Sequence, residues 1–270
     1  MSDVYLFGHP VAHSLSPAMH NAAFRSLGLP HRYSARDVEP ERLVDVVTEL
    51  RHGEALGANV TIPHKEAAVR MVDETSDAVR ATGALNTIVR RGSRLAGANT
   101  DVEGFEASLV SPDGDLLRDG RVLVLGAGGA ARACVYVLLR RGVEVLVANR
   151  SAGRLESLAR SLETHGRRAR VVPWPKRDAS LAGLDAVVNA TPLGMQGEDP
   201  LDGLALPPVV VDIVPTAQET PLVKRARATE NVTVVNGLAM LLHQAARSFE
   251  LWTGVPAPLE VMRAALPRPA

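Results

Sequence analysis

A run of branched aliphatic residues that ends in a glycine cluster constrains the fold of this chain more than any other stretch. Residues 122–125 have the character of a buried strand, and the run after them is typical of a turn into a helix. The turn consists of Gly126, Ala127, Gly128, Gly129 and Ala130. The spacing Gly-x-Gly-x-x-Ala fits a dinucleotide fingerprint, in which the first glycine makes a tight turn and the second lets a pyrophosphate approach the backbone. The helix N-terminus adds unpaired N–H groups, so the loop predicts a phosphate-binding site.

Strands and helices alternate after this loop. The first helix is predicted to end at Arg141, with Gly142 as its C-terminal stop, and the next strand covers residues 143–148. Further strands are predicted at 169–172, 186–189, 209–214 and 232–235, with helices at 154–162, from Thr220, at 238–252 and at 258–266. Because parallel strands need crossover helices between them, the pattern predicts a Rossmann-type, doubly wound parallel sheet.

The amino-terminal third also alternates between short strands and helices. Strands are predicted at 4–7, 32–36 and 58–62, and helices at 17–27, 41–51 and 65–72. Ser16 is expected to cap the first helix, with Pro17 in its first turn. A glycine-bearing turn between 87–90 and 95–98 predicts a hairpin, and a helix at 102–110 follows. We expect an open α/β unit here, separated from the glycine-loop unit near the linker-like residues 111–115.

Composition argues against two classes of partner. Thirty basic and thirty acidic residues cancel, and aromatic residues make up 3% of the chain, so it lacks the basic surface and stacking platforms that bind nucleic acid. No uncharged run approaches the roughly 18 residues that span a bilayer, and no secretion signal is recognisable. The single cysteine, Cys134, falls in a predicted apolar helix and favours a reducing compartment. We expect a cytoplasmic protein without nucleic-acid or membrane partners.

The residues after the second strand of the glycine-loop unit select the nucleotide. An acidic residue there would bind a ribose 2′-hydroxyl and repel a 2′-phosphate. This chain has Asn149, Arg150 and Ser151 instead, followed by Arg154. The Arg150 guanidinium can stack on adenine or pair with a phosphate, and Asn149 can hydrogen-bond the ribose region. The pattern favours NADP over NAD, and the alternative is an Arg150 that is merely exposed to solvent.

Polar residues of the amino-terminal third fall at the ends of predicted strands and helices. They are Ser14, Ser16, Asn59, Thr61, Lys65, Asn86 and Asp101. Ligands bind at such positions in open α/β sheets, and this mixture of groups suits a small polyhydroxylated substrate. Each residue also has a structural interpretation, such as a helix cap for Ser16. No group of histidine, cysteine or acidic residues has metal-ligand spacing, so no metal is expected.

Motifs along nearly the whole chain resemble those of shikimate dehydrogenases. The first are His-Ser-Leu-Ser-Pro (13–17), Asn-Val-Thr-Ile-Pro-His-Lys (59–65), Gly-Ala-Leu-Asn-Thr (83–87) and Asn-Thr-Asp (99–101). The later ones are Gly-Ala-Gly-Gly-Ala-Ala-Arg (126–132), Asn149-Arg150, Asn-Ala-Thr-Pro-Leu-Gly-Met (189–195) and Asn236-Gly237 through Trp252-Thr253-Gly254. The resemblance implies NADP-linked, reversible reduction of 3-dehydroshikimate to shikimate in aromatic amino acid (chorismate) biosynthesis.

The resemblance also implies roles for individual residues. Lys65 and Asp101 would form the catalytic pair. Substrate would be bound by Ser14 and Ser16 through its carboxylate and by Thr61, Asn86, Asp101 and Gln244 through its ring hydroxyls, while Ile213 and Gly237 would join the glycine loop and residues 149–154 at the cofactor. Hydride delivery builds negative charge on a ketone oxygen, which a lysine can stabilise and protonate. The sequence leaves two roles open for Lys65, that of a proton carrier and that of an electrostatic stabiliser.

The same resemblance implies the domain limits. We expect a substrate-binding catalytic domain at 1–102, an NADP-binding Rossmann domain at 103–237, and carboxyl-terminal helices at 238–270 that return to the substrate domain through Gln244. A homodimer is left open.

One stretch departs from the family pattern, which is usually Asp-x-x-Tyr-x-Pro. This chain has Asp212-Ile213-Val214-Pro215-Thr216-Ala217. Because Pro215 has no hydroxyl, either water or another side chain replaces the tyrosine, or the preferred substrate differs from shikimate. The alternatives are therefore a dehydrogenase of quinate or another cyclic hydroxy acid, and a nucleotide-sensing module that has lost catalysis. The presence of both Lys65 and Asp101 argues against the sensing module.

Overall fold

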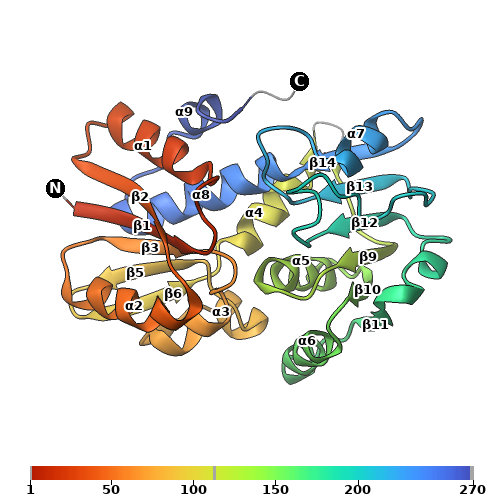
Figure 1. Cartoon of the computed structure of the whole chain (residues 1–270), viewed down its shortest axis with the longest axis horizontal. Coiled ribbons are helices and arrows are strands. Elements are labelled where there is room, and N and C mark those ends of the chain that lie inside the picture. Colours follow the sequence, from red (N-terminus) through yellow and green to blue (C-terminus); the bar gives the residue numbers. More distant parts are fainter. Residues whose placement is uncertain (1, 112–113, 268–270) are drawn as a thin grey trace. The chain divides into compact units, whose positions relative to one another are not determined.

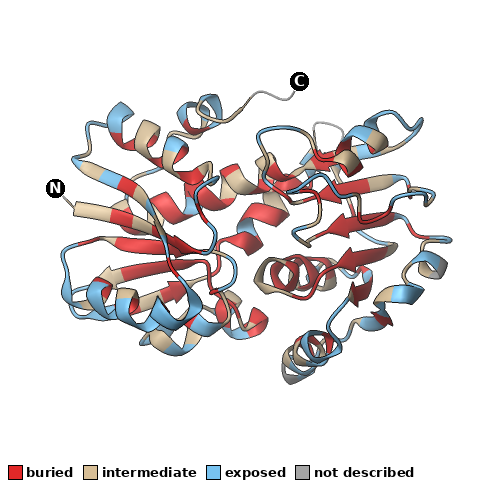
Figure 2. Cartoon of the chain, in the orientation of Figure 1, coloured by how far each residue is buried: buried red, intermediate tan, exposed pale blue. Residues whose placement is uncertain are grey.

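The computed structural model describes residues 2–111 and 114–267, and the chain folds into two compact units (Figure 1). The first unit comprises Met1–Gly104 and Leu242–Pro267, and the second comprises Phe105–Leu241. Each unit has its own six-stranded sheet, whose strands are mainly buried (Figure 2). No described helix has the length and apolar character needed to cross a membrane.

The sheet of the second unit is parallel throughout, with strand order β11-β10-β9-β12-β13-β14. Its strands are β9 (Arg121–Leu125), β10 (Glu144–Asn149), β11 (Arg170–Pro173), β12 (Ala186–Asn189), β13 (Val209–Asp212) and β14 (Thr233–Asn236). The order reverses between β9 and β12, which is where doubly wound sheets bind ligands. The predicted Rossmann-type fold is confirmed.

Helices connect these strands. They are α5 (Gly129–Arg140), α6 (Ala152–Thr164) and α7 (Pro221–Arg227), with short 3₁₀ turns at Trp174–Lys176 and Asp178–Ser180. Gly142 has φ +84°, a left-handed conformation that suits glycine beyond a helix end. The Ser151 and Thr220 hydroxyls accept N–H groups in the first turns of α6 and α7, so both helices have side-chain caps. Cys134 is fully buried in α5.

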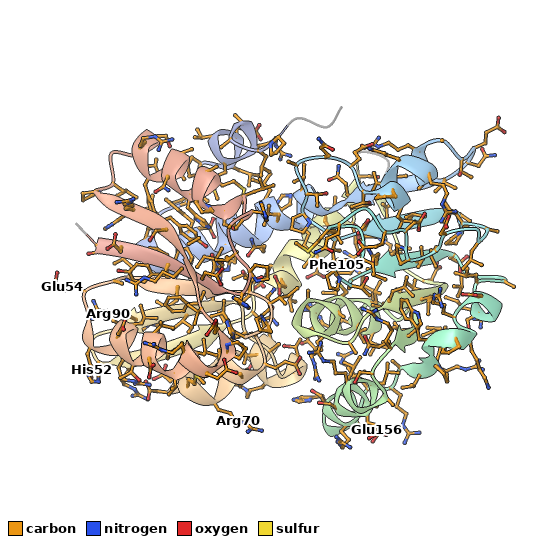
Figure 3. All side chains as sticks on the ribbon, in the orientation of Figure 1. His52, Glu54, Arg70, Arg90, Phe105 and Glu156 are labelled. Carbon is orange, nitrogen blue, oxygen red and sulfur yellow. The ribbon has the colours of Figure 1, made fainter. Side chains whose placement is uncertain are left out.

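The sheet of the first unit is mixed, in the order β2-β1-β3-β5-β6-β4. Its strands are β1 (Ser2–Gly8), β2 (His31–Asp37), β3 (Gly57–Val60), β4 (Glu74–Thr75), β5 (Thr87–Arg91) and β6 (Arg94–Ala98). Strand β1 is parallel to β2 and β3, whereas β5 is antiparallel to both β3 and β6, which confirms the predicted hairpin. Arg90 of β5, labelled in Figure 3, donates from Nε to the Ala55 carbonyl and so ties the hairpin to the loop before β3.

The helices of the first unit are α1 (Ser16–Ser26), α2 (Leu43–His52), α3 (Asp77–Thr82) and α9 (Leu259–Ala264), with 3₁₀ turns at Pro40–Arg42 and Ala67–Met71. Helices α4 (Asp101–Ser108) and α8 (Gly237–Thr253) each carry the chain from one unit into the other. On α8, Leu242, Ala245, Phe249 and Trp252 are buried, as expected of an apolar stripe.

Several local predictions are wrong. Ser16 is the first residue of α1 rather than its cap, because the Ser14 hydroxyl accepts the Ser16 N–H (3.2 Å) and Leu15 takes the cap position. The helix predicted at 65–72 is only a 3₁₀ turn, because Asp73 N–H bonds to the Leu95 carbonyl and draws the chain toward β6.

The predicted linker at 111–115 also differs. Strands β7 (Val110–Ser111) and β8 (Gly114–Asp115) pair there in an antiparallel hairpin, while residues 112 and 113 lie outside the described residues. The last part of the predicted carboxyl-terminal segment, residues 268–270, is likewise outside them.

Candidate active site

The mixed sheet of the first unit gathers polar residues from distant motifs at one edge. Strands β1 and β3 end there, and because β5 runs antiparallel to β3, its first residue starts at the same edge. Strand β6 reverses again and ends there. The loop with Ser14, the loop with Thr61 and Lys65, the turn with Asn86, and Asp101 therefore all emerge at this edge.

Lys65 and Asp101 form a close ion pair. The Lys65 Nζ lies 2.6 Å from Asp101 Oδ2, and the two side chains are 13% and 5% exposed. An ammonium has three donors, and this carboxylate oxygen accepts one of them. The pair thus holds a positive charge in a fixed position within a mostly dry environment, which is the arrangement that stabilises a developing oxyanion.

Asn86 orients the carboxylate of that pair. Its side-chain nitrogen donates to Asp101 Oδ1 (3.0 Å) and lies 3.1 Å from Gln244 Oε1, while its Oδ1 accepts the Thr100 N–H (2.7 Å). The bond from Thr100 fixes which way the amide points. The structure therefore brings four predicted site residues together, with Gln244 arriving from α8, far along the chain.

A further group of buried polar side chains supports Asn86. Asn59 donates from Nδ2 to the Asn86 carbonyl (2.9 Å) and lies 3.1 Å from Ser248 Oγ, and its Oδ1 accepts the Tyr33 hydroxyl (2.8 Å). Burial raises the pKa of Tyr33, so this hydroxyl stays a neutral donor. We did not predict Tyr33 or Ser248 from the sequence, although Ser248 lies one helical turn after Gln244 on the same face of α8 and was detectable by that spacing.

The predicted carboxylate-binding serines lie beside this group. Ser16 is buried, whereas Ser14 is half-buried. Thr61 is also half-buried, and its backbone N–H bonds to the Phe7 carbonyl at the end of β1 (2.9 Å). Hydroxyls with this partial exposure can reach a ligand while their backbone is held in place.

The glycine loop of the second unit has the geometry that its sequence predicts. Gly126 has φ +114°, and a Cβ there would lie 2.7 Å from the Ala190 carbonyl oxygen, so only glycine fits. Gly128 precedes α5, and a Cβ there would meet a single atom within 4 Å, Nη1 of Arg154 at 3.9 Å. The space above the helix N-terminus is therefore open, and a guanidinium borders it, as a phosphate site requires.

Residues 149–154 follow β10 in the same unit. Asn149 donates to the Ser151 carbonyl (3.1 Å), and Ser151 caps α6. Arg150 and Arg154 are exposed. The Arg154 guanidinium beside the open helix N-terminus, with a second exposed guanidinium at the end of β10, fits an anionic nucleotide with more than one phosphate group.

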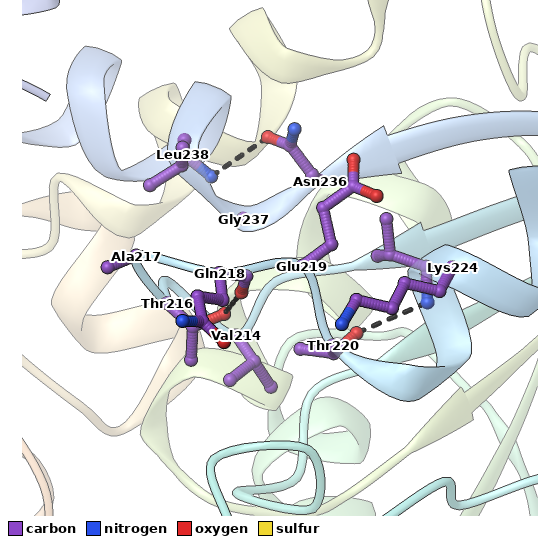
Figure 4. A pocket seen from close by; sticks show the side chains of 11 residues that line it. Val214, Thr216, Ala217, Gln218, Glu219, Thr220, Lys224, Asn236, Gly237 and Leu238 are labelled. Carbon is purple, nitrogen blue, oxygen red and sulfur yellow. Dashed lines mark hydrogen bonds between the residues drawn. The ribbon is translucent and has the colours of Figure 1, made fainter. Parts of the chain in front are cut away.

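Gly237 has a packing role that sequence reasoning missed. A Cβ there would lie 2.6 Å from backbone atoms of Ile213 and Val214, so glycine allows α8 to begin directly against the segment after β13. A pocket of about 270 Å³ adjoins this contact (Figure 4). Its lining includes Val214, Thr220, Lys224, Asn236 and Gly237.

Within residues 2–111 and 114–267, no three histidine, cysteine or acidic side chains are grouped so that they could hold a metal ion. His64 is buried and its Nε2 lies 2.7 Å from the Val38 carbonyl oxygen, which is a structural contact.

Comparison with known proteins agrees with this geometry. Residues 6–88 match the family model described as the shikimate dehydrogenase substrate binding domain, residues 108–194 match shikimate/quinate 5-dehydrogenase, and residues 237–266 match the shikimate 5'-dehydrogenase C-terminal domain. Shikimate dehydrogenase (NADP(+)) of Salinibacter ruber is 45% identical over 267 residues, covering 94% of this chain and 93% of that protein.

The shikimate dehydrogenase (NADP(+)) of Symbiobacterium thermophilum is 46% identical over 271 residues, covering 96% of this chain and 92% of its own length. A crystal structure of Thermus thermophilus shikimate 5-dehydrogenase with NADP(H) and shikimate superposes with a TM-score of 0.82 and 37% identity, covering 98% of both chains. The identities, the coverage and the three matching domain models together show that this chain belongs to the shikimate dehydrogenase family.

Proposed function

We propose that this protein catalyses the NADP-dependent, reversible reduction of 3-dehydroshikimate to shikimate, a step of aromatic amino acid biosynthesis. The observation that carries the proposal is the Lys65–Asp101 pair, a fixed and mostly buried ammonium among half-buried hydroxyls at a sheet edge. Family membership supports the reaction, and the Thermus thermophilus relative was crystallised with both ligands.

In this proposal the first unit binds the substrate. Ser14 and Ser16 would bind its carboxylate, and Thr61, Asn86 and Gln244 would hold its ring hydroxyls. Lys65 would donate a hydrogen bond and then its proton to the ketone oxygen as negative charge develops there. Asp101 would keep the ammonium in place, and Asn86 would hold Asp101. In the oxidative direction the Lys65 amine would take the proton back.

The second unit would bind NADP(H), which supplies or accepts the hydride. The residues present fit this group, because the helix N-terminus above Gly128 is open and the exposed guanidinium of Arg154 borders it. The proposed cofactor residues are Gly126, Ala127, Gly128, Gly129, Ala130, Asn149, Arg150, Ser151, Arg154, Ile213 and Gly237. Arg150 would meet the 2′-phosphate that distinguishes NADP from NAD.

The proposal includes domain limits at 1–102, 103–237 and 238–270, and a homodimer in the cytoplasm. The single buried Cys134 supports a reducing compartment. Light scattering of the purified protein tests the dimer, and cell fractionation tests the compartment.

A dehydrogenase of quinate is the second candidate, and Pro215 is the residue that favours it, because the family tyrosine is absent there. We expect shikimate to be preferred, with a kcat/KM at least about tenfold above that for quinate, or about 1.4 kcal/mol of transition-state binding. Initial rates of NADP⁺ reduction with each acid measure this ratio. An equal or higher value for quinate would reverse the assignment, and no turnover of either would support a nucleotide-sensing module.

A further inference from the structure

Asp212 is a buried carboxylate at the end of β13 with no place in the mechanism above. It is 0% exposed. Its Oδ1 accepts Asn189 Nδ2 (2.9 Å) and the Val214 N–H (3.2 Å), and its Oδ2 accepts the Thr220 hydroxyl (2.6 Å). All three partners are donors, and none of them is a cation. The site therefore matches an ionised carboxylate, which accepts hydrogen bonds and donates none.

These bonds link three segments at the carboxyl edge of the parallel sheet. Asn189 in turn holds the loop after β12. Its Oδ1 accepts both the N–H and the hydroxyl of Thr191, and its Nδ2 also donates to the Leu193 carbonyl. Thr220 in turn caps α7. A single carboxylate thus fixes the loop after β12, the segment after β13 and the start of α7.

Two of these segments press directly on glycines of the proposed cofactor site. The Ala190 carbonyl oxygen would lie 2.7 Å from a Cβ on Gly126, and the Val214 carbonyl oxygen would lie 2.6 Å from a Cβ on Gly237. Figure 4 shows Val214, Thr220 and Gly237 around the same pocket. Because backbone meets backbone in both places, a shift of either segment changes the shape of the cofactor site.

We propose that Asp212 is a positioning residue that sets the affinity for NADP(H) by holding the backbone at residues 190 and 214 against the two cofactor-site glycines. The inference rests on the proposed function only in taking NADP(H) as the ligand. Asp212 acts through the backbone that it holds and does not contact the cofactor itself.

The protonation state of Asp212 gives the proposal a measurable signature. The pKa of Asp212 is raised from 3.8 to about 6. Burial is the largest cause, and the charge of Asp199 acts in the same direction, whereas the hydrogen bonds from Thr220, Val214 and Asn189 lower the pKa. A protonated Asp212 accepts hydrogen bonds more weakly, and of its three partners only the Thr220 hydroxyl can turn to accept the added hydrogen, so the charge-assisted bonds that hold the three segments weaken. Affinity for NADP(H) should therefore fall as the pH drops through about 6.

Two acidic residues near Asp212, Asp199 and Glu219, are each paired with an arginine. Asp199 accepts a hydrogen bond from Arg225 Nε (2.8 Å), and Glu219 Oε1, beside Thr220, forms an ion pair with Arg227 Nε (2.6 Å). Since the folded pKa lies above 3.8, ionised Asp212 also destabilises the fold: the stability present below about pH 4 is lost as the pH rises through about 6.

The test is the dissociation constant for NADPH, measured by its fluorescence for wild type and Asp212→Asn at about pH 8 and about pH 5. At pH 8 we expect the variant to bind about tenfold more weakly, the scale of one lost charge-assisted hydrogen bond. At pH 5 the difference should narrow to about twofold, because wild-type Asp212 is then mostly protonated. The 2′-phosphate titrates in both proteins, so it cancels in the comparison.

Asp185 provides a matched control at the opposite edge of the sheet. It directly precedes β12, and its carboxylate accepts the Arg121 N–H (2.7 Å), so Asp185→Asn removes the charge from a similar bond to the backbone far along the strand from the cofactor edge. Its affinity for NADPH should stay within about twofold of wild type at both pH values.

Thr220 keeps the proposal testable if Asp212→Asn does not fold. Thr220→Ala removes the donor to Oδ2, so the midpoint of the pH dependence should move upward, and Thr220→Ser should restore it. Equal NADPH affinity of wild type and Asp212→Asn, or a difference that is the same at both pH values, would overturn the proposed role of Asp212. The proposed function of the protein would still stand. If wild type itself fails to bind NADPH, the proposed function falls and this inference falls with it.

Discussion

Replacing Lys65 with alanine should lower kcat/KM for 3-dehydroshikimate reduction by at least about 10²-fold, or about 2.7 kcal/mol of transition-state stabilisation. The physical reason is that the ammonium held 2.6 Å from Asp101 is the one positive charge that the proposal places at the ketone oxygen. The measurement is the initial rate of NADPH oxidation, with circular dichroism to show that the fold persists, because Asp101 loses its partner in this variant.

Two comparisons make that result specific. Lys176→Ala removes an exposed lysine from the second unit and should leave the rate unchanged. Lys65→Ala combined with Asp101→Asn should lose little more than the worse single variant, because residues that act as a unit are not additive. A folded Lys65→Ala with wild-type turnover would remove Lys65 from the mechanism, and fully additive losses would contradict the pair.

Reversing the charge of Arg150 should weaken NADP⁺ binding by at least about 30-fold and leave NAD⁺ binding within about twofold. A unit charge near another is worth about 1 kcal/mol in water at about 4 Å, and Arg150→Asp changes the local charge by two units opposite the 2′-phosphate. Arg150 is exposed, so the higher dielectric of water is the appropriate one. Dissociation constants for both nucleotides at equal ionic strength measure the effect.

Arg168→Asp provides the control for this experiment, because Arg168 is an exposed arginine of the same unit outside the proposed cofactor residues. It makes the same change in net charge and should affect both nucleotides little. Equal losses of NADP⁺ and NAD⁺ affinity in Arg150→Asp would show that Arg150 does not bind the 2′-phosphate.

The parts of the fold that sequence alone predicted are those with local signals. Residues 122–133 contain an aliphatic strand, a glycine turn and a helix start, and each is recognisable from residues only a few positions apart. The parallel sheet was predicted because this strand–helix pattern repeats along the chain. Gly142 ended α5 as predicted, since a left-handed conformation beyond a helix end favours glycine.

The parts that sequence missed depend on distant partners. Strand β4 is two residues long and exists because Glu74 and Thr75 pair with β6, so no periodicity of its own reveals it. The Asn59–Ser248 contact joins residues 189 positions apart. Periodicity shows which face of α8 is buried but not which side chain a buried serine will meet.

The candidate site shows the same division. Lys65 and Asp101 were identified by family motifs, and the structure brings them into contact. Tyr33 was not, because it lies within a predicted strand, where nothing in the sequence separates a buried hydrogen-bonding group from an ordinary surface residue. Asp212 belongs to the family pattern Asp-x-x-Tyr-x-Pro, but the sequence did not predict its hydrogen-bond partners. Their partners became visible only once the strands were placed side by side.

The most direct test of the account is the reaction of the purified protein with NADPH and 3-dehydroshikimate, with nucleotide absorbance and product identity followed together. We expect one NADPH to be oxidised for each shikimate formed, and NADP⁺ with shikimate to run the reaction in reverse. Tight NADPH binding without oxidation, or oxidation that yields a different product, would contradict it.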